Sequence, residues 1–129
     1  MEKPVILVVE DNQTQQKVIA LLAEEFGYKV ILAGSGQEAL EHARRPENQF
    51  TLVLMDIALP DFDGLICTQK LREVLPGPPI PVVAMSAFLA DDLRASCMAA
   101  GLDDYLEKPF SAKELQSMLT KWAARRDPV

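Results

Sequence analysis

Four short apolar runs and a fifth, more polar segment, each followed by a stretch with helical spacing, limit this chain to very few folds. The first run, VILVV at residues 5–9, is continuous and rich in β-branched residues, which is typical of a strand covered on both faces. Similar runs predict strands at residues 28–33, 51–55 and 81–85, and residues 104–107 are expected to form a short fifth strand. Helical spacing predicts helices at residues 12–26, 37–45, 65–75, 91–100 and 111–126. Strands that alternate with helices in this way form a parallel sheet with helices on both faces, so the predicted fold class is α/β.

Local signals predict several of the element ends. Gly27 and Gly101 stand where helices end, and glycine is the usual residue just beyond a helix. The last helix begins at Ser111, and Glu114 three residues later completes the pattern of a capping box. These signals agree with the periodicity and strengthen the alternating pattern.

Composition and charge exclude several classes of protein. The chain has 129 residues, of which 49% are apolar and 25% charged, so residues 1–129 are expected to form one globular domain. A net charge of -6 argues against direct nucleic-acid binding. Cys67 and Cys97 are expected to be buried, reduced thiols of a cytoplasmic domain. No apolar run is long enough for a membrane span or a secretory signal, so the domain itself is expected to make no membrane contact.

Polar residues follow four of the five predicted strands. Glu10 and Asp11 end the first, Asp56 the third and Ser86 the fourth, and Lys108 follows the fifth. The carboxyl ends of parallel strands meet at one sheet edge, so these side chains are expected to converge. Three carboxylates in one place repel one another unless a cation lies among them. Oxygen ligands without His or Cys favour a hard ion, and Mg²⁺ above all.

These motifs resemble the receiver domain of response regulators in two-component phosphorelays. That family has an acidic pair after the first strand, an aspartate after the third, a hydroxyl after the fourth and Lys-Pro after the fifth. The loop DIALPDFDG and an aromatic residue three positions before the lysine, here Tyr105, also match. The resemblance covers nearly the whole chain and implies the flavodoxin-like strand order 2-1-3-4-5. It further implies a cis peptide bond before Pro109.

The resemblance implies a role for each site residue. Asp56 would accept a phosphoryl group from a partner's phosphohistidine. Asp11 and Asp56 would hold Mg²⁺ together with the backbone carbonyl of Ala58, and Glu10 would act through a metal-bound water.

Three further residues complete the implied mechanism. Lys108 and the Ser86 hydroxyl would contact the phosphoryl oxygens. Ser86 and Tyr105 would then switch the surface of the domain after phosphorylation. The domain would thus assist its own phosphorylation and dephosphorylation without being an enzyme in its own right.

The implied partners are a histidine kinase or a histidine phosphotransfer domain. The motifs are most similar to receivers of hybrid sensor histidine kinases, so the chain is expected to be a stand-alone receiver or the cytoplasmic part of a membrane-bound sensor. We expect a monomer or a weak dimer. A hybrid sensor that contained it would itself be a histidine kinase.

Other functions are less consistent with the sequence. A phosphatase of the haloacid dehalogenase type needs a second aspartate where Ala58 stands. A flavin or nucleotide carrier needs a phosphate-binding loop, and EDNQTQQ would repel phosphate. A pseudo-receiver that binds partners without phosphorylation stays as the alternative.

Several polar residues are expected to have only structural roles. Asp61 and Asp63 are interpreted as loop and cap residues, and Gly64 as a turn residue. His42 is expected at the surface, and Asp104 at a solvated edge. Met98 and Trp122 are interpreted as packing residues.

Overall fold

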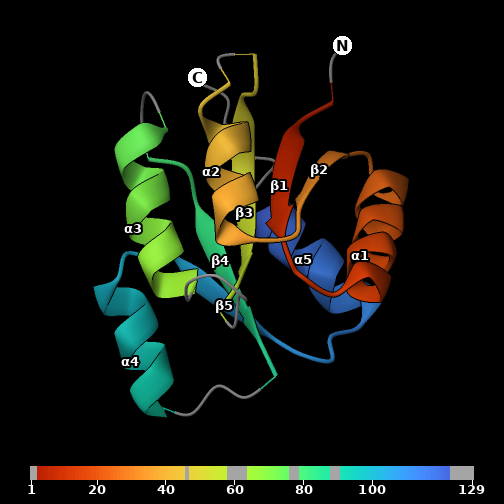
Figure 1. Cartoon of the computed structure of the whole chain (residues 1–129). Coiled ribbons are helices and arrows are strands. Elements are labelled where there is room, and N and C mark those ends of the chain that lie inside the picture. The colour runs from red at the N-terminus through yellow and green to blue at the C-terminus, as the bar shows by residue number, and fades with distance from the viewer. Residues whose placement is uncertain (1–2, 46, 58–63, 76–78, 88–90, 123–129) are drawn as a thin grey trace.

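The computed structural model describes residues 3–45, 47–57, 64–75, 79–87 and 91–122, with the side chains of 91–94 excepted, as five strands and five helices (Figure 1). The strands are β1 (Val5–Val9), β2 (Lys29–Ala33), β3 (Phe50–Asp56), β4 (Val82–Ser86) and β5 (Asp104–Glu107). The helices are α1 (Gln13–Glu25), α2 (Gly36–Ala43), α3 (Gly64–Val74), α4 (Asp91–Ala99) and α5 (Ala112–Trp122). Each predicted element is present, and most ends differ from the prediction by one or two residues. The predicted end of the last helix, residues 123–126, lies outside the described part of the chain.

The five strands form one parallel sheet in the order β2-β1-β3-β4-β5, which confirms the predicted fold. Figure 1 shows α1 and α5 on one face of the sheet and α2, α3 and α4 on the other. Successive strand residues point to opposite faces, so Leu7 and Val9 pack with α2, α3 and α4, whereas Ile6 and Val8 pack with α1 and α5. Burial on both faces explains why β1, β3 and β4, which lie inside the sheet, are apolar without alternation.

The caps are formed by the residues that the sequence singles out. The Ser111 amide donates to Glu114 Oε1 at 2.9 Å and the Glu114 amide donates to Ser111 Oγ at 3.1 Å, so the predicted capping box is present. Gly27 has φ 99° and Gly101 has φ 98°, the left-handed conformation that favours glycine at a helix end. Helix α2 begins one residue earlier than predicted because the Ser35 hydroxyl caps it.

Burial corrects three of the structural interpretations. Met98 is 56% exposed and does not pack in the core. His42 is half-buried, and its Nε2 donates to the Leu32 carbonyl at 3.2 Å. Asp104 accepts hydrogen bonds from the Trp122 indole at 2.9 Å and from Lys121 at 3.0 Å, so it links β5 to α5 instead of lying at a solvated edge.

Cys67 and Cys97 are buried free thiols, as predicted. Across the described residues, the helices are too short or too polar to cross a membrane.

Candidate functional site

Three side chains that are far apart in sequence meet at the carboxyl edge of the sheet. Glu10 follows β1, Asp56 ends β3 and Lys108 follows β5. Since β1 and β3 are neighbours in parallel register, with Val9 opposite Met55, the two acids must emerge side by side. The strand order therefore assembles this part of the site from backbone geometry alone.

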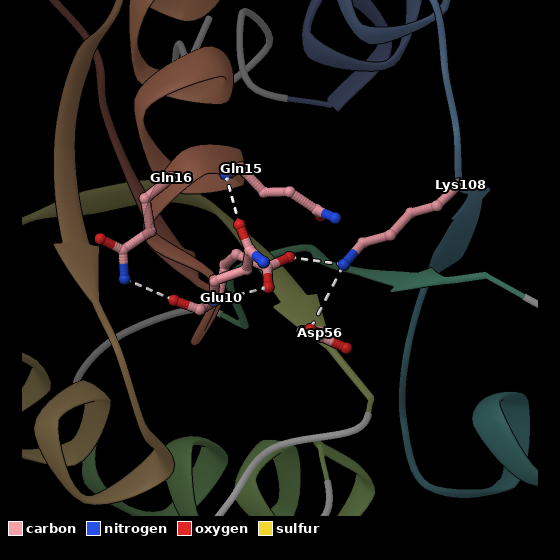
Figure 2. A network of polar contacts seen from close by, with 6 residues as sticks. Glu10, Gln15, Gln16, Asp56 and Lys108 are labelled. Carbon is pink, nitrogen blue, oxygen red and sulfur yellow. Dashed lines mark hydrogen bonds and ion pairs between the residues drawn. The ribbon is translucent and has the colours of Figure 1, made fainter.

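Lys108 joins the two acids. Its Nζ lies 2.5 Å from Glu10 Oε1 and 3.3 Å from Asp56 Oδ2, and Figure 2 shows the ammonium group between the two carboxylates. Glu10 is 1% exposed and Asp56 6% exposed, so both charges are largely removed from water. One ammonium group cannot neutralise two carboxylates, and the pair keeps a negative excess.

Asp11 adds a third carboxylate to the cluster. A carboxylate oxygen of Glu10, one of Asp11 and one of Asp56 lie within 4.8 Å of one another. Asp11 is exposed to solvent. An oxygen-only donor set with excess negative charge fits a hard divalent cation, so these residues could hold a metal ion. The proposed fourth ligand, the carbonyl of Ala58, lies outside the described residues.

The electrostatics of Glu10 reflect its burial. Burial raises the pKa of the Glu10 carboxyl, and the hydrogen bonds from Lys108 and from the Asn12 amide oppose that rise only in part. The neighbouring Asp56 charge raises the pKa of Glu10 further. A cation placed beside Glu10 would oppose this rise, because it favours the charged form of the Glu10 carboxyl.

The backbone around Glu10 is held by residues at the start of α1. The Asn12 amide donates to Glu10 Oε2 at 3.1 Å, and Gln16 Nε2 donates to the Glu10 carbonyl at 2.5 Å (Figure 2). The Asn12 side chain in turn accepts from the Gln15 amide at 2.9 Å and caps the helix. Gln16 was not predicted as a site residue, because its only signal in the sequence is its place in the first turn of α1.

Ser86 and Tyr105 lie where the pattern predicts. Ser86 ends β4, next to the end of β3, and its carbonyl accepts from the Lys108 amide at 2.7 Å. Tyr105 is in β5 opposite Ala84 and is half-buried against the core face that α2, α3 and α4 cover. The Lys108–Pro109 peptide bond is cis, as the resemblance implies.

Gly64 packs directly against the backbone that carries Asp56. A Cβ atom on Gly64 would lie 2.5 Å from the Asp56 carbonyl oxygen and 2.8 Å from Ile57 Cα, and these are backbone atoms that cannot rotate away. The Gly64 amide also donates to the Ile57 carbonyl at 2.7 Å. The turn interpretation of Gly64 therefore understates its role, because this close approach sets the path of the chain after Asp56.

We expect Gly64→Ala to reduce the free energy of unfolding by about 2 kcal/mol, because overpacking forces the backbone to shift. Urea denaturation would measure the loss. Gly34→Ala is the matched control, since a Cβ atom there would meet only side-chain atoms at 3.5 and 3.6 Å, which are ordinary contacts. Equal stability of the two variants would contradict the close-packing account.

Comparison with known proteins agrees with this geometry. The family model described as "Response regulator receiver domain" matches residues 6–120. The chain belongs to the response regulator receiver family. Receiver domains serve two-component signalling and interact with histidine kinases or phosphotransfer domains.

Relatives come from hybrid kinases and from transcriptional regulators. The chain is 38% identical over 121 residues to the hybrid signal transduction protein dokA of Dictyostelium discoideum, covering 93% of this chain and 7% of that protein. It is 34% identical over 122 residues to the sensor histidine kinase GacS of Pseudomonas protegens, covering 92% of this chain and 13% of that protein. For the transcriptional regulatory protein ZraR of Escherichia coli K12 the identity is 35% over 124 residues, with 96% and 27% covered. The chain thus spans a small part of each of these relatives.

Solved receiver domains have the same architecture. The receiver domain of sensor histidine kinase PA1611 from Pseudomonas aeruginosa PAO1 is 37% identical, with a TM-score of 0.84 over 95% of this chain and 98% of that chain. That structure has a magnesium ion coordinated in its active site cleft. A CheY-like receiver from Methanospirillum hungatei is 25% identical, with a TM-score of 0.83 over 93% of both chains.

Proposed function

We propose that Asp56 accepts a phosphoryl group from a phosphohistidine of a partner protein and that the domain then relays or signals this event. The observation that carries the proposal is the contact of Lys108 with both Glu10 and Asp56, beside the exposed carboxylate of Asp11. In the transfer, an Asp56 carboxylate oxygen bonds to phosphorus while the phosphorus–nitrogen bond breaks. The electron pair of the broken bond stays on the imidazole nitrogen. Phosphoryl transfer of this kind needs positioning and charge neutralisation more than covalent help.

The residues around Asp56 supply that neutralisation. Lys108 already lies within reach of Asp56, and the Ser86 hydroxyl can donate to a phosphoryl oxygen. We assign Glu10, Asp11, Asp56 and the Ala58 carbonyl as the groups that hold Mg²⁺, in keeping with the ion described for the PA1611 receiver. When bound, Mg²⁺ offsets the negative charge of the phosphoryl oxygens.

Phosphorylation would act as a switch through Ser86 and Tyr105. The phosphoryl group adds negative charge at Asp56 and attracts the Ser86 hydroxyl. Movement of Ser86 frees space beside β4, and Tyr105 on the adjacent β5 can then turn inward. The surface formed by α4, β5 and α5 would report the change to a partner.

Two exposed aliphatic side chains lie on the helix that begins next to Glu10. Val18 is 49% exposed and Leu21 68% exposed, both on α1, which begins next to Glu10. We include these two side chains in the surface that would contact a partner at the start of phosphoryl transfer. We assign this surface to the histidine kinase or histidine phosphotransfer domain that exchanges the phosphoryl group. We also propose a cytoplasmic location for the domain, as for the receivers of hybrid kinases.

The direct test is labelling of the purified domain with acetyl phosphate, with and without Mg²⁺. We expect a phosphorylated product that requires Mg²⁺ and that hydroxylamine cleaves, as it cleaves acyl phosphates. A folded wild-type domain that stays unlabelled would favour the pseudo-receiver alternative, in which the same surface binds partners without phosphorylation.

We expect the phosphorylated domain to lose its phosphate slowly. In receivers, the positions two residues after the phosphoacceptor and two after the switch hydroxyl flank the path of the attacking water. Here they are Ala58 and Phe88, which lie outside the described residues and have side chains that cannot orient water. Because positioning a nucleophile accelerates its attack, Ala58→Asn combined with Phe88→Glu should shorten the phosphate half-life by about tenfold or more. The decay of labelled protein in Mg²⁺ measures this, and an unchanged half-life would contradict it.

A further inference from the structure

A cavity opens beside Lys108 at the start of α1. Its volume is about 410 Å³, and Val18, Ile19, Ala87, Pro109 and Phe110 form its apolar wall. Two polar side chains, Gln15 and Lys108, also line it. Lys108 thus belongs both to the lining of this cavity and to the ion pair with Asp56, the proposed phosphoacceptor.

Gln15 is placed in this cavity by the cap of α1. The backbone N–H of Gln15 donates to Asn12 Oδ1 at 2.9 Å, which fixes the backbone of the first turn. The next residue, Gln16, is directed the other way and donates to the Glu10 carbonyl. Figure 2 shows the Gln15 side chain extended toward Lys108 and away from Gln16. No hydrogen bond from the Gln15 side chain to another described residue is present, so its amide is available to a molecule that enters.

The lining of the cavity fits an aromatic ring with a polar edge. An imidazole can pack its faces on the apolar wall, while its polar edge needs hydrogen-bond partners. A phosphohistidine has one ring nitrogen bonded to phosphorus, and its other ring nitrogen can carry a proton. A neutral amide can accept a hydrogen bond from that N–H group. A carboxylate at the same position would instead compete with Asp56 for Lys108.

We propose that the side-chain amide oxygen of Gln15 accepts a hydrogen bond from the imidazole of the phosphohistidine that enters this cavity. This contact would orient the ring for in-line transfer to Asp56. This inference rests on the proposed function. The contact keeps the proton on the distal ring nitrogen while the phosphorus–nitrogen bond breaks, so the neutral imidazole leaves with the bonding electron pair. The Gln15 contact would therefore assist donors that carry a ring and would do nothing for donors without one.

Two small phosphodonors, one with an imidazole ring and one without, test whether the Gln15 contact depends on the ring. N-phosphoimidazole carries the ring, whereas acetyl phosphate carries none, and both can be supplied with Mg²⁺ to the whole chain. We expect Gln15→Ala to slow labelling by N-phosphoimidazole about fivefold, as for the loss of one ordinary hydrogen bond. Labelling by acetyl phosphate should change less than about twofold, within the effect of an ordinary exposed substitution.

Gln13→Ala is the matched control, because Gln13 is exposed in the same turn and does not line the cavity. It should leave both rates unchanged. Equal slowing of both donors by Gln15→Ala, or slowing of neither, would overturn the ring contact while the proposed function stands. A wild-type domain that neither donor labels would overturn the proposed function itself.

Discussion

Asp56→Asn is expected to abolish phosphoryl labelling from every donor. The asparagine amide has nearly the same shape as the carboxylate, but its oxygen carries no full charge and is a poor nucleophile and a poor ligand for a hard cation. The fold should tolerate the change, because Lys108 keeps its 2.5 Å contact with Glu10 and one of two neighbouring buried charges is removed. We therefore expect the free energy of unfolding to stay within about 1 kcal/mol of the wild type. Phosphate-affinity electrophoresis after incubation with acetyl phosphate and Mg²⁺ measures the labelling, and urea denaturation checks the fold.

Glu107→Gln is the control for this experiment. Glu107 is an exposed carboxylate at the end of β5, directly before Lys108, and it does not belong to the acidic cluster. Its neutralisation changes the net charge by the same amount and should leave labelling intact. Undiminished labelling of Asp56→Asn would move the phosphoacceptor to another residue. Loss of labelling in both variants would show that labelling depends on overall charge instead of on Asp56.

The convergence of the site could be predicted because it depends on few choices. Once the apolar runs define parallel strands, every strand end lies at one sheet edge. Glu10, Asp56 and Lys108 then have little freedom, since each is within one residue of a strand end. Their proximity is a property of topology, and the sequence pattern determines that topology.

Contacts made by long side chains could not be predicted in the same way. Arg72 donates to the Gly101 carbonyl at 2.7 Å and pairs with Asp103 at 3.0 Å, which links the end of α3 to the loop before β5. Asp104 accepts from Trp122 and Lys121, and although burial alone would raise the pKa of Asp104, these hydrogen bonds lower it. Each of these contacts depends on the relative rotation of two helices or loops, and periodicity does not specify that rotation.

The close approach of Gly64 to the backbone of Asp56 and Ile57 could not be predicted from the sequence either. A glycine after a loop signals a turn in most sequences. Only the packing of α3 against the chain after Asp56 shows that a methyl group would collide with backbone. Residue type and spacing determine which strand ends meet. The distances of closest approach depend instead on how the helices pack against the sheet.

Lys108→Gln is expected to slow labelling of Asp56 about 100-fold, because a positioned charge that stabilises the transition state is lost. The same change should strengthen Mg²⁺ binding. Lys108 lies 2.5 Å from Glu10 and 3.3 Å from Asp56, so it competes with any cation for these oxygens and repels it. Binding and reactivity should therefore move in opposite directions, which a simple loss of structure would not produce.

Stability provides the third measurement on this variant. Glu10 is 1% exposed, and without Lys108 its charge has no ammonium partner. We expect the free energy of unfolding in the absence of metal to fall by about 3 kcal/mol, as for a buried pair that loses one member. Mg²⁺ should restore most of this loss, because a bound ion stabilises the folded state more strongly the tighter it binds.

Lys113→Gln, at an exposed position in the first turn of α5, is the matched control. It should change neither the labelling rate, nor the Mg²⁺ affinity, nor the free energy of unfolding. If Lys108→Gln weakened Mg²⁺ binding as well as labelling, Lys108 would be acting as a scaffold for the acidic cluster, and its assignment as the residue that neutralises the phosphoryl group would be wrong.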